Sequence, residues 1–292
     1  MTSIADCVRT GARALEQAGW TPDDGRRDAE ALARGLLNWD TATWLAERRE
    51  AAPPAFVDAF AESLARRLRH EPVAYIVGAR EFYGRLFSVT RDVLIPRPET
   101  ELVVDEALAV IDAKTSAGHA VCAVVDVGTG SGCLAVTLAL ERPGLRVIAT
   151  DISAGALAVA ATNAARLGAA DRVRFVRTSL ADGLEGTFDV IVSNPPYVSV
   201  RDRASLMPDV RDYEPHEALY GGDDGLEMIR AVIDLSGARL RPGGSLVMEL
   251  GAGQSGDAAE RVSASTGLRL VRVAPDLNGI PRVLVAERPP GS

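Results

Sequence analysis

Cysteine and histidine are scarce in this sequence of 292 residues, with three of each. The cysteines Cys7, Cys122 and Cys133 lack the spacing of metal ligands, and the last two lie in apolar segments, where cysteine usually acts as a small buried side chain. The histidines are scattered, and none has a second ligand at helical spacing, so we expect no metal site. Because no disulfide framework is indicated, a reducing cytoplasm is the expected location.

Long apolar runs are also missing. The longest, such as residues 121–127, have the length of a strand rather than of a membrane span. Residues 1–11 include Asp6 and lack the basic-then-apolar pattern of a signal peptide. We therefore expect neither export nor a membrane partner.

Positive charge is in deficit. The chain has 32 basic and 40 acidic residues, a net charge of −8 and a pI near 5.1. Lys114 is the single lysine, which we attribute to genome composition rather than to function. Proteins that hold nucleic acid through its phosphates usually carry a basic footprint, so the balance argues mildly against direct nucleic-acid binding, although a local basic patch remains compatible with it.

The first 75 residues are rich in alanine, leucine and arginine and carry apolar residues at helical spacing. Pro22 follows a threonine and precedes two aspartates, which is typical of a helix start. After a break at two prolines, Phe56, Phe60 and Leu64 recur at intervals of four on one helical face. We predict a small all-helical domain over residues 1–75.

Residues 76–99 differ in character. Residues 82–87 predict two short strands around a glycine turn. Residues 95–100, Ile-Pro-Arg-Pro-Glu-Thr, form a stiff extended segment, because each proline fixes its own backbone and restricts the residue before it. We predict a β-hairpin and linker here, followed by a helix from about residue 100 to residue 111.

From residue 100 to residue 292 strand and helix patterns alternate. Near-continuous apolar strands separated by helices indicate an α/β fold with a parallel sheet covered on both faces. The last two strands are joined by a loop too short for a parallel crossover, so the final strand should be antiparallel to its neighbour. The predicted strands are 121–127, 146–150, 173–176, 190–193, 246–249, 268–273 and 283–286, and the predicted helices are 131–141, 153–168, 225–239 and 253–265.

A glycine-rich loop, residues 126–132, follows the first strand and opens a helix. Its glycines alternate as G-x-G-x-G rather than in the G-x-G-x-x-G dinucleotide pattern, which suits a ligand without a pyrophosphate. Asp151 ends the next strand, where a carboxylate can accept both hydroxyls of a ribose. A plain strand-to-helix turn and a helix N-cap are the structural alternatives for these two features.

Asn194-Pro195-Pro196-Tyr197 follows the apolar strand at 190–193. The prolines fix the direction of the Pro195 carbonyl, Asn194 adds an acceptor and Tyr197 adds a flat face, so the segment can hold a planar –NH2 group. Accepting both hydrogens returns electron density to a nitrogen whose lone pair is delocalised, and fixed geometry aligns it with an electrophilic methyl group. A rigid turn after a strand is the alternative.

The order of glycine loop, strand-end acid and Asn-Pro-Pro-Tyr resembles the class I methyltransferases that modify planar nitrogens. Residues 95–100, 213–215 and 218–225, together with the helical front domain, make the chain similar over essentially its whole length to the bacterial release-factor glutamine methyltransferases. The resemblance implies a seven-stranded, mostly parallel sheet with the last strand antiparallel. It also implies methylation by S-adenosyl-L-methionine of the glutamine in the Gly-Gly-Gln loop of class I peptide chain release factors. Apart from the resemblance, we expect a monomer and propose that the helices of residues 1–75 dock the protein substrate.

The resemblance also implies roles for particular residues, with residues 100–292 as the catalytic domain. The cofactor would be bound by Gly128, Thr129, Gly130, Ser131, Gly132, Asp151 and Asn194, with Ser179 and Leu180 beside the adenine. The glutamine would be held by Asn194, Pro195, Pro196 and Tyr197, of which Asn194, Pro195 and Tyr197 would be catalytic. Arg97, Glu99 and Glu214 would lie near the substrate entrance, although ion pairing by Arg97 and helix N-terminal charge for Glu99 are equally compatible.

Three alternatives stay open. The same four-residue motif serves methylation of an exocyclic adenine amine in DNA or RNA, which requires the base to be extracted. A related enzyme that modifies a ribosomal-protein glutamine would share this site, and a cofactor-binding scaffold without activity is the non-enzymatic possibility.

Overall fold

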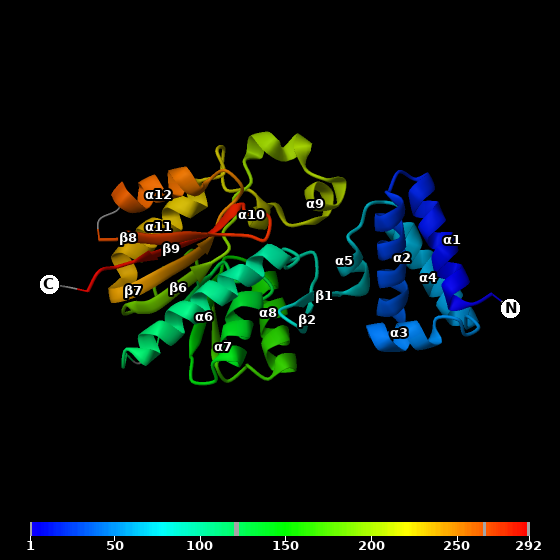
Figure 1. Ribbon diagram of the computed structural model, residues 1–292, viewed down its shortest axis with the longest axis horizontal. Helices are drawn as coiled ribbons and strands as arrows, with labels where there is room; N and C mark the ends of the chain where they lie inside the picture. The colour runs from blue at the N-terminus through cyan, green and yellow to red at the C-terminus, as the bar shows by residue number, and fades with distance from the viewer. Residues whose placement is uncertain (1, 120–122, 265–266, 291–292) are drawn as a thin grey trace. The chain divides into compact units, whose positions relative to one another are not determined.

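The computed structural model of the chain describes residues 2–119, 123–264 and 267–290. These residues form two compact units, each with its own core (Figure 1). The helical unit comprises Met1–Ala79 and the separate segment Met207–Tyr213, and the α/β unit comprises Arg80–Leu206 and Glu214–Ser292.

The first two helices of the helical unit begin at side-chain caps, and the second starts where Thr21 and Pro22 predict. Ser3 caps the first helix in a capping box with Asp6, and Thr21 caps the second, with Pro22 in its first turn. The helices are α1 (Ile4–Gln17), α2 (Pro22–Leu37), α3 (Thr41–Glu47), α4 (Pro54–Arg67), α5 (Val73–Val77) and α9 (Pro208–Tyr213). Their core gathers ten buried apolar residues: Ile4, Val8, Ala12, Leu15, Ala29, Leu32, Ala33, Trp44, Phe56 and Phe60.

Helix α9 joins this unit from far along the chain. The Arg67 guanidinium, largely buried, lies 2.6 Å from Asp28 and 3.7 Å from Asp209. The Tyr213 hydroxyl donates to the Arg69 carbonyl at 2.6 Å. The sequence pattern does not predict that α9 belongs to the helical unit, because this placement depends on ionic and hydrogen-bonding partners that are distant in the chain.

The predicted hairpin is present at the start of the α/β unit as β1 (Ala79–Phe82) and β2 (Arg85–Ser88). Tyr83 and Gly84 between them both have positive φ, at 51° and 68°. That pair of values is what a two-residue turn needs to match the twist of its strands.

The main sheet confirms the predicted class I α/β architecture. In the described residues it contains seven strands in the order β5-β4-β3-β6-β7-β9-β8. The five strands from β5 to β7 are parallel, and β9 is antiparallel to both β7 and β8. The strands are β3 (Val124–Val127), β4 (Val147–Asp151), β5 (Val173–Arg177), β6 (Phe188–Ser193), β7 (Leu240–Glu249), β8 (Arg269–Pro275) and β9 (Pro281–Glu287).

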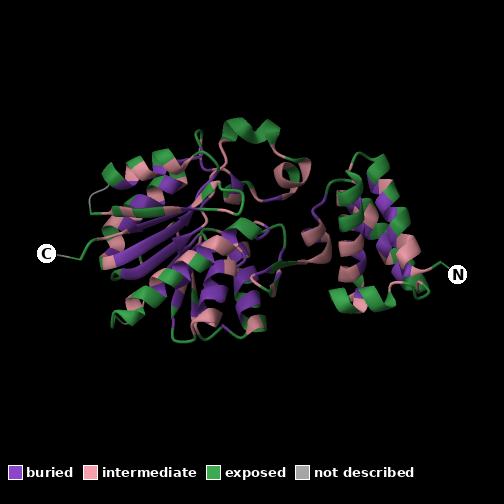
Figure 2. Cartoon of the chain, viewed as in Figure 1, coloured by how far each residue is buried: buried purple, intermediate pink, exposed green. Residues whose placement is uncertain are grey.

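Helices cover both faces of this sheet, as near-continuous apolar strands require (Figure 1). One face carries α6 (Glu101–Ser116), α7 (Cys133–Glu141) and α8 (Ala154–Leu167), and the other carries α11 (Glu227–Arg239) and α12 (Ser255–Ala264). Every residue of β3 and of β6 is buried (Figure 2). Two apolar clusters, one on each face, form the core between sheet and helices.

The differences from the sequence prediction are local. Strand β7 begins at Leu240 rather than at residue 246, because Arg241–Gly244 contains a proline and two glycines that indicate a turn in isolation. Short helices after β6 were not predicted: η2 (Val200–Ser205), α9 and α10 (His216–Leu219), and a 3-10 turn, η1 (Pro98–Thr100), precedes α6. Residues 121, 122 and 265 of the predicted elements lie outside the described residues, as does Cys122.

No helix in the described part of the chain has both the length and the apolar character of a membrane span.

Candidate active site

The glycine loop turns sharply between β3 and α7. Gly128, Gly130 and Gly132 all have positive φ, and the amides of Gly128 and Thr129 both donate to the Thr150 carbonyl at 2.9 Å. At Gly132 a Cβ would come within 3.1 Å of the Ala160 Cβ, so a glycine lets α7 and α8 approach closely. The loop therefore lies at the carboxyl edge of β3 and β4, where ligands bind in open α/β sheets.

Asp151 closes the loop from the end of β4. Its Oδ2 accepts from the Gly130 amide at 2.9 Å, and its Oδ1 accepts from the Ser153 amide at the same distance. Ser153 itself caps α8, so Asp151 is not the N-cap that the sequence left open. The half-buried carboxylate is thereby fixed beside the loop with lone pairs left for a ligand.

A second carboxylate, Asp126, lies behind the loop and is fully buried. Its Oδ2 accepts from the Thr129 hydroxyl at 2.7 Å and from the Ala135 amide at 3.2 Å, while its Oδ1 has no described partner. Burial raises the pKa of this carboxyl from 3.8 to about 7.

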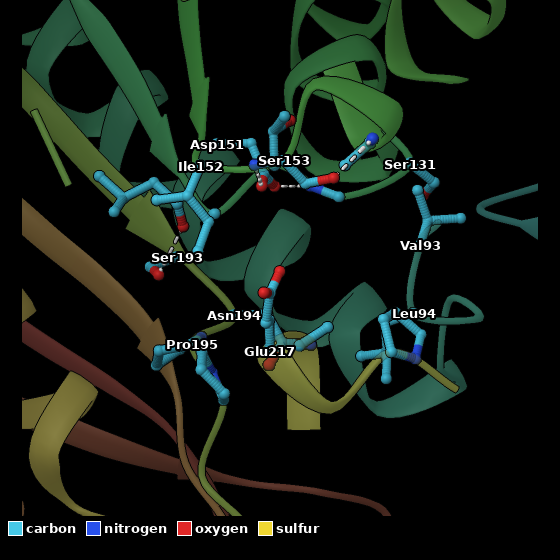
Figure 3. Close-up of a pocket in the computed structure, with 18 of the residues that line it drawn as sticks. Val93, Leu94, Ser131, Asp151, Ile152, Ser153, Ser193, Asn194, Pro195 and Glu217 are labelled. Carbon is cyan, nitrogen blue, oxygen red and sulfur yellow. Dashed lines mark hydrogen bonds between the residues drawn. The ribbon is translucent and has the colours of Figure 1, made fainter. Parts of the chain in front are cut away.

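A cavity of about 490 Å³ joins these features within the α/β unit (Figure 3). Most of the predicted cofactor and substrate residues line it: Gly128, Thr129, Gly130, Ser131, Asp151, Ser179, Leu180, Asn194, Pro195 and Pro196. Gly132, Tyr197, Arg97, Glu99 and Glu214 are not among its lining residues. The structure thus brings the glycine loop, the strand-end acid and the first three residues of the Asn-Pro-Pro-Tyr segment to one space.

The Asn-Pro-Pro-Tyr segment leaves the end of β6 directly beside the glycine loop. Ser193 ties the two strand ends together, because its hydroxyl donates to the Val127 carbonyl at 2.8 Å. Asn194 Nδ2 donates to Thr100 Oγ1 at 3.0 Å, and no hydrogen bond from the described residues reaches Oδ1. Asn194 therefore presents a free acceptor at the cavity wall.

Tyr197 ends this segment and does not line the cavity. Its hydroxyl donates to Glu249 Oε1 at 3.2 Å, and its carbonyl accepts from Gln254 Nε2 at 2.9 Å. A Cβ on Gly251 would come within 3.0 Å of the ring. Burial and the neighbouring Glu249 raise the pKa of the Tyr197 phenol, so it stays protonated. The stacking of this ring on a substrate amide stays a prediction.

The three charged residues assigned to the substrate entrance lie near the cavity but not in its wall. Arg97 pairs with the buried Glu214 at 2.5 Å, which is the ion pairing that the sequence left open. Glu99 is exposed in η1, ahead of α6. The neighbours Pro96, Thr100 and Pro215 do line the cavity, so the ion pair holds two wall segments together.

Several lining residues were missed. The loop at residues 91–94 and Glu217, on α10, contribute to the wall, and Ile152, next to Asp151, is about half exposed. An isoleucine directly after a strand-end acid is a usable signal for an apolar ligand contact. The loop at 91–94 carries no such signal, because only the fold brings it to this edge.

The residues present fit S-adenosylmethionine. Asp151 offers a carboxylate for ribose hydroxyls, Ile152 and Leu180 offer apolar surface for an adenine, and the glycine loop leaves room for the amino-acid end. The sheet order and this site define a class I S-adenosylmethionine-dependent methyltransferase.

Comparison with known proteins gives the family. Residues 6–78 match the PrmC N-terminal domain model, and residues 104–207 match the methyltransferase small domain model. The chain is 43% identical over 285 residues to the release factor glutamine methyltransferase of Cereibacter sphaeroides, which covers 98% of each chain. It is 43% identical to that of Bordetella pertussis, covering 88% of this chain and 93% of the relative. The chain therefore belongs to the release factor glutamine methyltransferase family.

Solved structures share the fold at low sequence identity. The hMettl16 catalytic domain in complex with MAT2A 3'UTR hairpin 1 aligns with a TM-score of 0.56 at 16% identity, covering 90% of this chain and 95% of that one. A methyltransferase from Pyrococcus furiosus aligns with a TM-score of 0.50 at 18% identity, covering 78% and 99%. These likenesses concern the fold alone.

Proposed function

We propose that this chain transfers a methyl group from S-adenosylmethionine to the side-chain amide nitrogen of the glutamine in the Gly-Gly-Gln motif of class I peptide chain release factors. The observation that carries the proposal is the placement of Asn194, which lines the same cavity as the glycine loop and Asp151 and whose Oδ1 accepts no hydrogen bond from the described residues. An acceptor at that point selects an –NH2 group.

The chemistry follows from two acceptors. Asn194 Oδ1 and the Pro195 carbonyl each accept one hydrogen of the glutamine amide, because Pro195 and Pro196 fix the backbone between them. This returns electron density to the amide nitrogen and holds it in line for displacement. Bound S-adenosylmethionine supplies an electrophilic methyl on a positively charged sulfur. The product loses its extra proton to water or to a carbonyl, so no strong base is required.

The cofactor side of the site uses the residues predicted for it. Asp151 would accept the ribose hydroxyls, and Ser179, Leu180 and Ile152 would flank the adenine. Residues 128–132 would leave space for the amino-acid end of the cofactor. Gly132 acts indirectly, by allowing α7 and α8 to approach.

The choice of a release factor rests on family membership. The relatives from Cereibacter sphaeroides and Bordetella pertussis are both named release factor glutamine methyltransferases, and the first matches this chain over nearly its whole length. The N-terminal match at residues 6–78 covers most of the helical unit, to which we assign docking of the release factor.

Competition among possible substrates for the methyl group tests the proposal. Purified chain would be incubated with labelled S-adenosylmethionine and equimolar release factor, ribosomal proteins and adenine-containing DNA and RNA. Label should enter the release factor, and a release factor whose motif reads Gly-Gly-Asn should take up none. Label in nucleic acid or in a ribosomal protein instead would replace the proposal with one of the alternatives that share this site.

A further inference from the structure

A buried carboxylate lies behind the Asn-Pro-Pro-Tyr segment. Glu249 ends β7 and exposes 1% of its surface. Its Oε2 accepts from the Thr100 hydroxyl at 2.6 Å, and its Oε1 accepts from the Tyr197 hydroxyl at 3.2 Å. Both ends of the four-residue segment therefore connect to one group, Tyr197 directly and Asn194 through Thr100.

The chain of bonds from Glu249 to Asn194 has a direction. Burial raises the pKa of the Glu249 carboxyl, yet both of its oxygens accept from hydroxyl groups, so the single hydrogen of Thr100 is directed at Oε2. Thr100 Oγ1 can then only accept from Asn194, 3.0 Å away, and this requires the –NH2 side of that amide. Asn194 Oδ1 is consequently the atom left for a ligand.

Thr100 is placed in a way that its helix does not explain. It occupies the N-cap of α6, where a threonine hydroxyl usually accepts from a backbone amide of the first turn. Here it makes no capping bond, has helical backbone angles and is 1% exposed. The hydroxyl instead lies between Glu249 and Asn194, as a residue that serves the site would.

We propose that Glu249 and Thr100 are positioning residues that fix which face of the Asn194 amide meets the substrate, with Tyr197 holding the far end of the segment on the same carboxylate. The inference rests on the proposed role of Asn194 as the acceptor for the glutamine –NH2. If the amide were reversed, its –NH2 would face the –NH2 of the substrate, and the hydrogen bond that activates the nucleophile would be lost.

The test uses the full chain with three single substitutions. Thr100→Val keeps the shape and removes the hydroxyl, and Thr100→Ser keeps the hydroxyl as the matched control. We expect Thr100→Val to lower kcat by about 10-fold to 100-fold, with the cofactor Kd unchanged, and Thr100→Ser to stay within about 3-fold of wild type. Glu249→Gln can donate as well as accept, so it should lower kcat by about 2-fold to 10-fold. A wild-type kcat in Thr100→Val or in Glu249→Gln overturns the role of that residue.

A double substitution separates positioning from general damage to the fold. If Thr100 acts through Asn194, Thr100→Val should cause no further loss of kcat in an Asn194→Ala background. Losses that multiply would show that Thr100 acts elsewhere, and would overturn the proposal.

A spectroscopic readout keeps the inference separate from the choice of substrate. The side-chain amide protons of Asn194 should exchange slowly with solvent in wild type and in Thr100→Ser, and fast in Thr100→Val. Equal exchange in all three overturns the positioning role. If wild type fails to methylate the release factor, the proposed function fails, and the exchange rates still decide this inference.

Discussion

Two aspartates at neighbouring strand ends show how environment separates identical side chains. Asp151 is half-buried and accepts two backbone amides, whereas Asp126 is fully buried with one oxygen unpartnered among the described residues. Burial raises the pKa of Asp126 to about 7 from 3.8. Asp151 therefore suits a ligand with hydroxyl donors, while Asp126 stabilises the loop from behind.

The raised pKa of Asp126 predicts how stability depends on pH. The folded state holds this proton more tightly than the unfolded state. The contribution of Asp126 to the free energy of unfolding is therefore full at pH values below about 4, its pKa in the unfolded chain, and is lost as the pH rises to about 7. Asp126→Asn should flatten the free energy of unfolding between about pH 4 and pH 7, measured by urea titration. The control Asp171→Asn, at an exposed site, should keep the wild-type slope. An unchanged slope in Asp126→Asn contradicts the assignment.

The free acceptor of Asn194 predicts a split between catalysis and binding. Asn194→Ala should lower kcat by roughly 100-fold or more, because one of two acceptors for the –NH2 group is gone. The Kd for S-adenosylmethionine, measured by calorimetry, should change by less than about 3-fold, since the glycine loop and Asp151 remain. Asn278→Ala, on an exposed loop of the same unit, is the control and should leave both values unchanged. Equal losses of kcat and affinity would contradict the role of Asn194.

At the scale of elements, the glycine loop depends on close contact between two helices. Gly132 has a φ of +81°, and a Cβ there would lie 3.1 Å from the Ala160 Cβ. Gly132→Ala should cost about 1–2 kcal/mol in free energy of unfolding and weaken cofactor binding. Gly256→Ala, where a Cβ meets nothing within 4 Å, should be neutral or slightly stabilising. Equal melting temperatures for the two variants would contradict the idea that close contact between α7 and α8 at Gly132 matters for stability.

Elements are also the scale at which the sequence was most informative. The glycine loop, Asp151 and the Asn-Pro-Pro-Tyr segment were predicted together because each directly follows an apolar strand, and parallel strands end at one edge. Glu249 also ends a strand, β7, but the sequence analysis did not select it as a site residue. Its hydrogen-bond partners, Thr100 and Tyr197, are distant in the sequence and only the fold brings them together. The start of β7 was missed because proline and glycine there indicate a turn.

The whole molecule combines a catalytic unit with a helical unit, and the helical unit includes a segment from later in the chain, Met207–Tyr213. Residues 207–213 belong to the helical unit, although the sequence-based division at residue 75 places them in the catalytic domain. They begin ten residues after Tyr197, and Glu214 and Glu217 follow them. The chain thus runs from the proposed substrate site to the proposed docking unit and back.

Removal of residues 1–75 tests the docking role. The truncated chain should bind S-adenosylmethionine as wild type does, since the cavity is lined by the α/β unit alone. Its KM for intact release factor should rise by about 10-fold or more, while turnover on a short Gly-Gly-Gln peptide should be little affected. Wild-type KM for the intact protein in the truncated chain contradicts a docking role.

The central claim is that the –NH2 group held by Asn194 belongs to a release-factor glutamine. Mass spectrometry of a class I release factor co-expressed with the chain tests this most directly, with the Asn194→Ala chain as the matched control. The account predicts one added methyl group on the Gly-Gly-Gln glutamine with wild type, and a strongly reduced fraction with the variant. An unmodified glutamine beside wild-type chain, in a release factor that a known family member does methylate, would contradict it.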